Sequence, residues 1–206
     1  MAWTKEKTAI VAGAGLLLAA VTGIVIFYSR VTPVQGIPKG WSTISGDLDQ
    51  WEWANGAIHG HSSAGETILA SAREYRNVTL SVWAGTTNRE ASLAIRMQNA
   101  DNGYIIIFAP AGTPCPWNED GFIVLIRKIS GEEVTLRSYH GRIFSTLGPV
   151  ATIAVTATGP WIAVRLNDVT VFRVADTNFS SGFIGLRIFG SGEYSCDATF
   201  SHLIFH

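Results

Sequence analysis

The sequence predicts an all-β domain, a two-sheet antiparallel sandwich, preceded by one N-terminal transmembrane α-helix. Residues 8–28 form an unbroken segment without a charged side chain. From Trp41 onward, apolar and polar residues alternate with a period of two, the pattern of strands that bury one face. Turn-forming pairs such as Asn55-Gly56 separate these segments, and none of them has the periodicity of a helix. Many short strands at regular spacing favour two antiparallel sheets packed face to face.

The apolar segment is long enough to cross a bilayer, because about 21 residues at 1.5 Å each span roughly 31 Å. The alternative is a secretory signal peptide, which has a shorter apolar region of roughly 7–15 residues and a small-residue cleavage site. Here the run ends in Phe-Tyr-Ser-Arg at residues 27–30, which suits the membrane interface. We therefore expect an uncleaved single-pass anchor at residues 8–29, after a cytoplasmic N-terminus at residues 1–7.

The charges that flank this segment predict its orientation. Lys5 and Lys7 lie just before it, whereas Arg30 and Lys39 follow at wider spacing. Cytoplasmic flanks carry the excess of lysine and arginine, so we expect the N-terminus inside the cell. The protein would then lie in the inner or plasma membrane, with its C-terminal domain periplasmic or extracellular.

Residues 30–40 contain two prolines and form a short, stiff linker to the domain at residues 41–206. The formal charge of the chain is −1 and its charged fraction is 15%. These values argue against a nucleic-acid partner and against a polybasic grip on anionic lipids. We expect no cofactor, because no motif in the sequence predicts one.

The sequence has two cysteines, Cys115 and Cys196. Outside the cytoplasm a pair of cysteines is more often bridged than free, so we predict a disulfide between them. Sequence alone leaves two free thiols open, since it does not show whether the two Cα atoms approach. We predict no metal site. His59 and His61 alternate on one strand face, but the sequence supplies no third ligand, and we interpret them as surface histidines.

Alternation also predicts which residues occupy turns and the core. Asn55-Gly56 and Asn102-Gly103 supply the positive φ angles that tight hairpins require. Trp83 and Trp161 fall on alternating segments and are expected in the core. The predicted strands lie at residues 51–54, 57–62, 66–71, 75–84, 91–99, 103–109, 121–127, 133–140, 151–157, 160–167, 169–175, 181–189 and 196–205.

Six short motifs occur along the domain in a fixed order. They are WEWANGAI at 51–58, YRNVTL at 75–80, LAIR at 93–96 with NGY at 102–104, WIAVRLNDV at 161–169, GFIGL at 182–186 and FSHLIF at 200–205. Their order resembles that of the concanavalin A-like jelly-roll superfamily, and within it the laminin-G-like domains of the bacterial 3-keto-disaccharide hydrolase group. Asp168 stands where that group usually has glycine. The resemblance implies a two-sheet jelly-roll sandwich of the concanavalin A/laminin-G-like type.

The resemblance also bears on catalysis. Glycosidases need two carboxylates facing each other across the scissile bond, roughly 5–10 Å apart. In the related laminarinase branch they come from an E-x-D-x-(x)-E strand, and this sequence has no such strand. The acidic pairs Glu119-Asp120 and Glu132-Glu133 are adjacent residues in predicted turns. The sequence therefore favours a non-catalytic role.

A candidate ligand-binding patch combines the family's strand pair with one irregular loop at residues 114–120. Side chains of the strand pair would share one sheet face, and the loop carries residue types that stack on sugars and hydrogen-bond to them. An ordinary polar outer sheet beside an irregular loop is the alternative. The predicted ligand-binding residues are Arg96, Gln98, Tyr104, Trp117, Asn118, Glu119 and Asp120.

Two functions fit these observations. The first is a membrane-anchored, non-catalytic accessory or scaffold subunit of a larger membrane protein complex, such as a respiratory or photosynthetic one. Its partners would be other membrane subunits and the lipid bilayer, and small residues in the anchor would allow close helix packing. These helix-packing residues are Ala12, Gly15, Ala19 and Gly23. The alternative, which the resemblance implies, is a surface-anchored glycan-binding module or 3-keto-glycoside hydrolase with a carbohydrate partner. We expect the first function.

Overall fold

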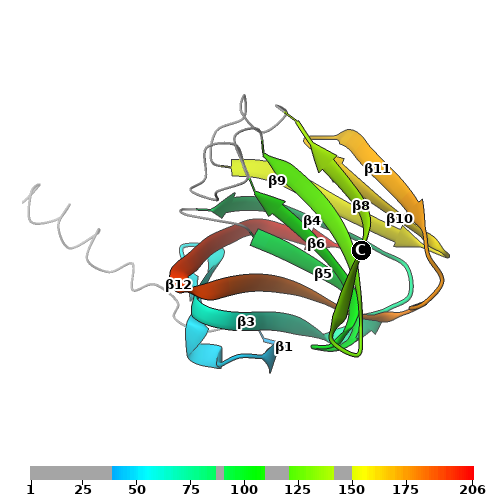
Figure 1. Ribbon diagram of the computed structural model, residues 1–206. Coiled ribbons are helices and arrows are strands. Elements are labelled where there is room, and N and C mark those ends of the chain that lie inside the picture. Colours follow the sequence, from blue (N-terminus) through cyan, green and yellow to red (C-terminus); the bar gives the residue numbers. More distant parts are fainter. Residues whose placement is uncertain (1–38, 87–90, 110–120, 142–149) are drawn as a thin grey trace, which may run out of the picture. The chain divides into compact units, whose positions relative to one another are not determined.

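The computed structural model describes residues 39–86, 91–109, 121–141 and 150–206, and strands make up most of these ranges (Figure 1). One short 3₁₀ helix, η1 (Leu48–Gln50), precedes the second strand. The strands in chain order are β1 (Trp41–Ser45), β2 (Trp51–Ala54), β3 (Ala57–Tyr75), β4 (Val78–Thr86), β5 (Ala91–Asn99), β6 (Asn102–Ala109), β7 (Phe122–Ile129), β8 (Glu132–His140), β9 (Val150–Thr158), β10 (Trp161–Leu166), β11 (Val169–Ala175) and β12 (Gly182–Phe205).

The strands form two sheets that share the two longest strands. Sheet I has the order β1, the C-terminal part of β3, the N-terminal part of β12, β5, β6, β7 and β8. Sheet II has the order β2, the N-terminal part of β3, the C-terminal part of β12, β4, β9, β10 and β11. All of these pairings are antiparallel, as in a jelly-roll sandwich.

β3 and β12 run side by side and pass together from one sheet to the other (Figure 1). Their pairing is interrupted between Ser191 and Cys196, where both strands change sheets. Gly190 permits the close approach at this bend, because a Cβ there would lie 2.4 Å from the carbonyl oxygen of Ser62. Gly65 has a φ of 80°, a conformation that glycine adopts without strain. Glycine at the bend therefore lets one pair of strands belong to both sheets.

The core lies between the sheets and takes every second residue of each strand. Leu69, Leu93 and Ile106 enter it from sheet I, and Leu80 and Val155 enter it from sheet II. All five side chains are fully buried. Such burial contributes about 1.5–3 kcal/mol for each large apolar side chain, and it accounts for the period-two pattern of the sequence.

The predicted all-β sandwich is confirmed, and most predicted strands lie where they were expected. Three predicted segments match β2, β5 and β11 at both ends. Two pairs of predicted segments prove to be single strands, β3 and β12, because the chain stays extended through the bend and the two strands pair again beyond it. β1 was not among the predicted strands.

The expected core positions of Trp83 and Trp161 are wrong. Their side chains are 45% and 41% exposed, and the neighbouring Val82 and Ile162 point into the core instead. Because side chains of a strand alternate between faces, each tryptophan takes the outer face of sheet II. Alternation was correct for these strands, but the tryptophans were assigned to the wrong face.

The prediction for the β5–β6 hairpin is also corrected. Asn99 pairs with Asn102, so the two turn residues come before the predicted Asn-Gly pair. Gly103 serves another purpose, because a Cβ there would lie 2.8 Å from the Cα of Met97. At Asn55 and Gly56 the prediction is confirmed, with φ angles of 54° and 76°.

Within the described ranges, no helix has the length and apolar character needed to cross a bilayer. The predicted anchor at residues 8–29 and most of the linker lie outside these ranges. The membrane location and the orientation therefore stay predictions. The same holds for the proposed helix-packing residues, which are Ala12, Gly15, Ala19 and Gly23.

Candidate functional site

Two of the predicted ligand-binding residues, Arg96 and Tyr104, are buried at one end of the sandwich. Arg96 is 1% exposed and Tyr104 is fully buried. The pairing of β5 with β6 is irregular between Ile95 and Asn99, and Arg96 has a φ of 51° within this irregularity. A bulge re-aims the side chain that it carries. Here it directs the guanidinium toward the connections between strands.

The Arg96 guanidinium ties three of these connections together. Its Nη1 donates to the carbonyl oxygen of Phe179 at 3.1 Å, and its Nη2 donates to those of Arg76 and Gly159 at 3.0 and 2.8 Å. Burial lowers the pKa of Arg96, but a guanidinium keeps its proton at any physiological pH. In the described structure, the guanidinium of Arg96 therefore holds these three connections together.

Tyr104 belongs to a second part of the same buried network, centred on Asp176. The Tyr104 hydroxyl donates to Asp176 Oδ1 at 2.6 Å, and Arg127 Nη1 donates to Oδ2 at 2.7 Å. Asn178 donates to Oδ1 from both its backbone and its side chain. Burial and the bond to Asp176 raise the pKa of Tyr104 to about 12. Burial alone would raise the pKa of Asp176, but its hydrogen bonds together lower it to about 2.

Of the other predicted ligand-binding residues, only Gln98 lies within the described ranges. Gln98 is exposed and donates from Nε2 to the carbonyl oxygen of Ser181 at 2.5 Å. Cys196 is fully buried, whereas its predicted disulfide partner lies outside the described residues. That pairing stays a prediction. The remaining predicted site residues outside the described ranges are Cys115, Trp117, Asn118, Glu119 and Asp120.

The outer face of sheet I is filled by its own side chains. A second apolar cluster lies there, separate from the core between the sheets, and its members are at most 8% exposed. On β6, the alternate positions of this face are Gly103, Ile105 and Ile107, so the strand presents no carboxylate on it. The cluster consists of Ile68, Ala94, Met97, Ile105 and Ile126.

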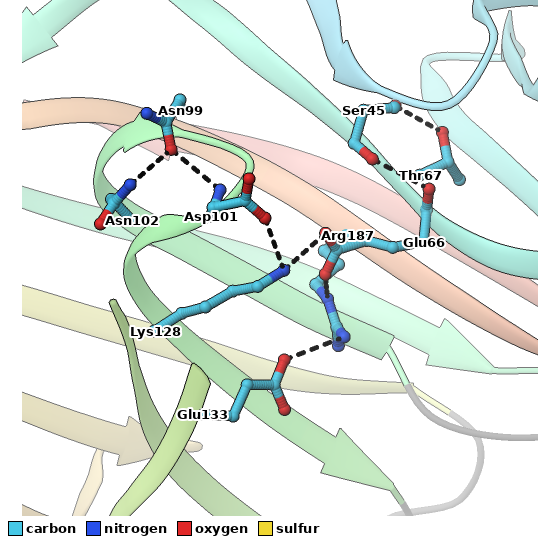
Figure 2. Close-up of polar contacts among 9 residues, drawn as sticks. All are labelled: Ser45, Glu66, Thr67, Asn99, Asp101, Asn102, Lys128, Glu133 and Arg187. Atoms are coloured by element: carbon cyan, nitrogen blue, oxygen red, sulfur yellow. Dashed lines mark hydrogen bonds and ion pairs between the residues drawn. The ribbon is translucent and has the colours of Figure 1, made fainter. Parts of the chain in front are cut away.

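A charged cluster covers the same face (Figure 2). Glu66 on β3 accepts hydrogen bonds from Arg187 Nε on β12 at 2.5 Å and from Lys128 Nζ on β7 at 3.0 Å. Asp101 lies 3.9 Å from Lys128, and Glu133 lies 3.7 Å from Arg187. Strands β12, β5 and β6 separate β3 from β7, which would place them about 19 Å apart in a flat sheet. The contact between Glu66 and Lys128 therefore requires a strongly curved sheet whose outer face is concave.

A polar groove of about 340 Å³ lies on sheet II, where η1, β2, β3 and β12 meet. Two cross-strand rows form its floor. In the first row, His59 pairs with Glu52 on one side and with Thr199 on the other. In the second row, His61 pairs with Asp197. These polar side chains share one face because the register between β3 and β12 aligns them.

The groove histidines are oriented by their neighbours on β12. His59 Nδ1 lies 3.1 Å from Thr199 Oγ1, and His61 Nδ1 lies 2.6 Å from Asp197 Oδ1. Since Nδ1 of each ring is engaged within the sheet, Nε2 is the ring atom that can meet a ligand. The lining also includes Asp49, and among the described residues it contains no lysine or arginine. The side chains of the groove can donate hydrogen bonds to the hydroxyl groups of a neutral polar ligand and accept hydrogen bonds from them.

An aromatic pair lies close to the groove on the same sheet. The ring centroids of Trp83 and His202 are 3.8 Å apart. Trp83 lies opposite Ser201, two residues along β12 from the groove residue Thr199. The exposed indole offers an apolar platform beside a polar groove, which is the combination that a sugar ring requires.

Sequence reasoning did not find this groove. The alternation of His59 and His61 was visible, but their partners on β12 lie 140 and 136 residues away. Only the pairing of β3 with β12 brings them together, and local alternation does not show which distant strand will be the partner.

Neither a protein-family model nor any curated protein matches this chain. Solved structures do. Carbohydrate-binding module CBM66 from Bacillus subtilis has a TM-score of 0.65 at 19% identity, over 81% of this chain and 95% of that chain. A prokaryotic β-1,3-1,4-glucanase (lichenase) from a mouse hindgut metagenome has a TM-score of 0.60 at 13% identity, over 82% and 94%. The β-glucanase of Bacillus licheniformis has a TM-score of 0.58 at 10% identity, over 82% of this chain and 93% of that chain.

The fold is a jelly-roll sandwich. At these identities the likeness shows the fold alone, and it agrees with the expected concanavalin A-like superfamily. The similar structures are a carbohydrate-binding module and two glucanases. None of the three carries a name that connects it with a membrane complex, and the scaffold function that the sequence led us to expect stays a prediction.

Proposed function

We propose that the domain is a non-catalytic carbohydrate-binding module that takes a neutral glycan in the groove on sheet II. The observation that carries the proposal is the alignment of Glu52, His59 and Thr199 in one cross-strand row beside the pair of His61 and Asp197. These groups face an open groove of about 340 Å³, enough for one or two sugar rings.

The chemistry of the groove suits hydroxyl groups. Carboxylates accept hydrogen bonds from sugar hydroxyls, and imidazole rings donate or accept according to their tautomer. Asp49, Glu52 and Asp197 line the groove, and no lysine or arginine does so in the part of the chain that the structure describes, so a negatively charged sugar would be repelled. Trp83 lies near one end, where a ring could stack on the exposed indole.

A binding role fits better than hydrolysis. The concave face of sheet I is occupied by the apolar and charged clusters, and β6 carries Gly103, Ile105 and Ile107 there. In the groove, Asp197 is paired with His61 at 2.6 Å, so it is not poised as a lone general acid. The family-based alternative of a 3-keto-glycoside hydrolase has no specific observation in its favour.

We further infer that the N-terminal segment at residues 8–29 displays this module at the outer surface of a membrane. The uncharged run and its basic N-terminal flank support the inference. A short stiff linker would keep the groove near the bilayer, so its ligand would belong to the cell envelope or to material that reaches it.

Affinity electrophoresis of the full chain in mild detergent tests the proposal. Migration in gels with β-1,3-1,4-glucan and a panel of other neutral polysaccharides is compared with migration in plain gels. We expect retardation by at least one glycan without release of soluble sugar. Glu52→Gln should weaken it about tenfold or more, since a hydrogen bond to a charged group contributes about 1.5–3 kcal/mol. Trp83→Ala should weaken it by a factor of about two to ten, since ring stacking contributes about 0.5–1.5 kcal/mol.

The matched control is Asp168→Asn, which makes the same carboxylate-to-amide change at an exposed turn outside the groove. Its retardation should equal that of the unaltered protein. If no polysaccharide retards the protein, or if the groove variants are retarded as strongly as the control, the groove is not a glycan site. Release of sugar would replace binding with hydrolysis.

A further inference from the structure

A second pocket, of about 240 Å³, lies at the end of the sandwich where three connections meet. Arg76 lines it from the β3–β4 turn, and Gly159 and Pro160 line it from the β9–β10 turn. The connection from β11 to β12 supplies the remaining wall, with Asp176, Thr177, Phe179 and Ser180. We call it the end pocket. It shares no lining residue with the groove on sheet II.

A buried positive charge lies directly beneath the end pocket. The guanidinium of Arg96 donates to the carbonyl oxygens of Arg76, Gly159 and Phe179, and all three of these residues line the pocket. The Arg96 side chain is 1% exposed, and its Nε is buried without a hydrogen-bond partner. A single hydrogen bond therefore links each of these wall residues to the positively charged guanidinium of Arg96.

This charge has no acidic counter-ion. Over the described ranges, every hydrogen bond of Arg96 goes to a backbone carbonyl, and no carboxylate forms an ion pair with it. Asp176 is an acid of the pocket lining, but Arg127 neutralises it, and both of its oxygens accept hydrogen bonds from within the protein. A buried charge without a partner is costly, and its field reaches whatever enters the pocket.

Residues on the pocket surface add further positive charge and further hydrogen-bond donors. Arg76 is exposed, and its guanidinium has no ion pair among the described residues. Thr177 and Ser180 contribute hydroxyl groups, while Pro160 and Phe179 contribute apolar walls. The lining thus includes one arginine and two hydroxyl-bearing residues, and the buried guanidinium of Arg96 is bonded to its wall; such groups complement negatively charged oxygen atoms.

We propose that the end pocket binds a small oxyanion: the carboxylate, sulfate or phosphate group of an acidic ligand. Such a group could come from an acidic sugar or from a free inorganic anion. The site is separate from the groove, where three carboxylates disfavour anions, and it does not rest on the proposed glycan binding. The domain would then carry two sites of opposite charge preference.

Titrating the isotope-labelled full chain with sodium sulfate, sodium glucuronate or glucose tests this proposal. Glucose has the same ring as glucuronate but no carboxylate. The backbone amide resonances of Gly159, Thr177 and Ser180 report on the end pocket. We expect both anions to shift them saturably and glucose to leave them unchanged. Affinity should fall as sodium chloride is added, because screening weakens the attraction.

Arg76→Glu tests the contribution of charge at an exposed position where folding is not at risk. It should weaken anion binding about tenfold or more. The matched control is Arg165→Glu, which makes the same charge change at the opposite end of β10, and it should alter the affinity less than twofold.

Comparing the affinities of the two anions distinguishes an acidic sugar from a free inorganic anion as the ligand of the end pocket. Tighter binding of glucuronate indicates an acidic sugar, and equal or tighter binding of sulfate indicates an inorganic anion. The proposal is overturned if neither anion shifts the three amides, if glucose matches glucuronate, or if Arg165→Glu weakens binding as much as Arg76→Glu. None of these results bears on the groove, whose test uses neutral polysaccharides and other variants.

Discussion

Asp176 shows how a single side chain can hold one end of the sandwich together. It receives hydrogen bonds from Tyr104 on β6, from Arg127 on β7 and from Asn178 in the connection before β12. Its side chain is 7% exposed. The network links sheet I to the β11–β12 connection, so its strength depends on Asp176 remaining ionised.

The lowered pKa of Asp176 predicts how stability depends on pH. The pKa is about 2 in the folded protein against an ordinary value of 3.8. A depressed folded pKa contributes stability above the unfolded value, and this contribution is lost as pH falls from 3.8 toward 2. Its size is about 2 kcal/mol. Asp176→Asn should therefore lower the free energy of unfolding by about that amount at neutral pH, and by progressively less below about pH 4.

Urea denaturation at several pH values measures this difference. Asp168→Asn is the control, because Asp168 is 92% exposed and its removal should leave the pH dependence unchanged. A destabilisation by Asp176→Asn that stays constant down to the lowest pH would contradict the assignment, because it would mean that loss of packing dominates.

At the scale of elements, the charged cluster of Figure 2 joins strands of sheet I across its concave face. Glu66 is 14% exposed and joins β3 to β7 and β12 through Lys128 and Arg187, which are themselves buried. Glu133 belongs to the same cluster, but it is 38% exposed and lies 3.7 Å from Arg187. The two glutamates therefore offer a matched comparison of a buried and a half-exposed member.

Glu66→Gln should destabilise the domain by about 3–5 kcal/mol, because it leaves two buried cations without their shared counter-ion. Glu133→Gln should cost less than about 1 kcal/mol, since solvent already screens that pair. Chemical denaturation of both variants in one buffer compares them. Equal effects would show that burial of the cluster does not govern its contribution.

At the scale of the whole molecule, period-two alternation specified the strands well because burial between two sheets imposes it directly. The ends of β2, β5 and β11 were predicted correctly, and the bends of β3 and β12 were marked by glycines. Which face each residue took was harder to predict. Trp83 was expected in the core because it falls on an alternating segment, yet the alternation of β4 puts it on the outer face.

The sites could be predicted far less well than the fold. The motif that suggested Arg96 and Tyr104 as ligand-binding residues places both side chains in a buried network, where a bulge turns Arg96 into the end of the sandwich. The groove depends on the pairing of His61 with Asp197, which lies 136 residues away. Chemistry that depends on register between distant strands leaves no local signal in a sequence.

The orientation of the whole chain gives the last prediction. Lys5 and Lys7 precede the uncharged segment, so the N-terminus should be cytoplasmic and the sandwich should lie outside. A folded sandwich can resist proteases, so short epitope tags at the two termini are the better reporters. A tag after His206 follows an exposed residue at the end of β12 and should leave the core intact.

In intact spheroplasts, antibody should label the C-terminal tag fully and the N-terminal tag only after lysis. Lys5→Glu with Lys7→Glu should weaken this preference, because it removes the basic flank that favours the cytoplasmic side. The control, Arg165→Glu, alters charge in the sandwich and should leave the labelling unchanged. Labelling of the N-terminal tag alone in intact cells would reverse the topology. The groove would then face the cytoplasm, away from any extracellular glycan, and the oxidising setting assumed for Cys115 and Cys196 would no longer hold.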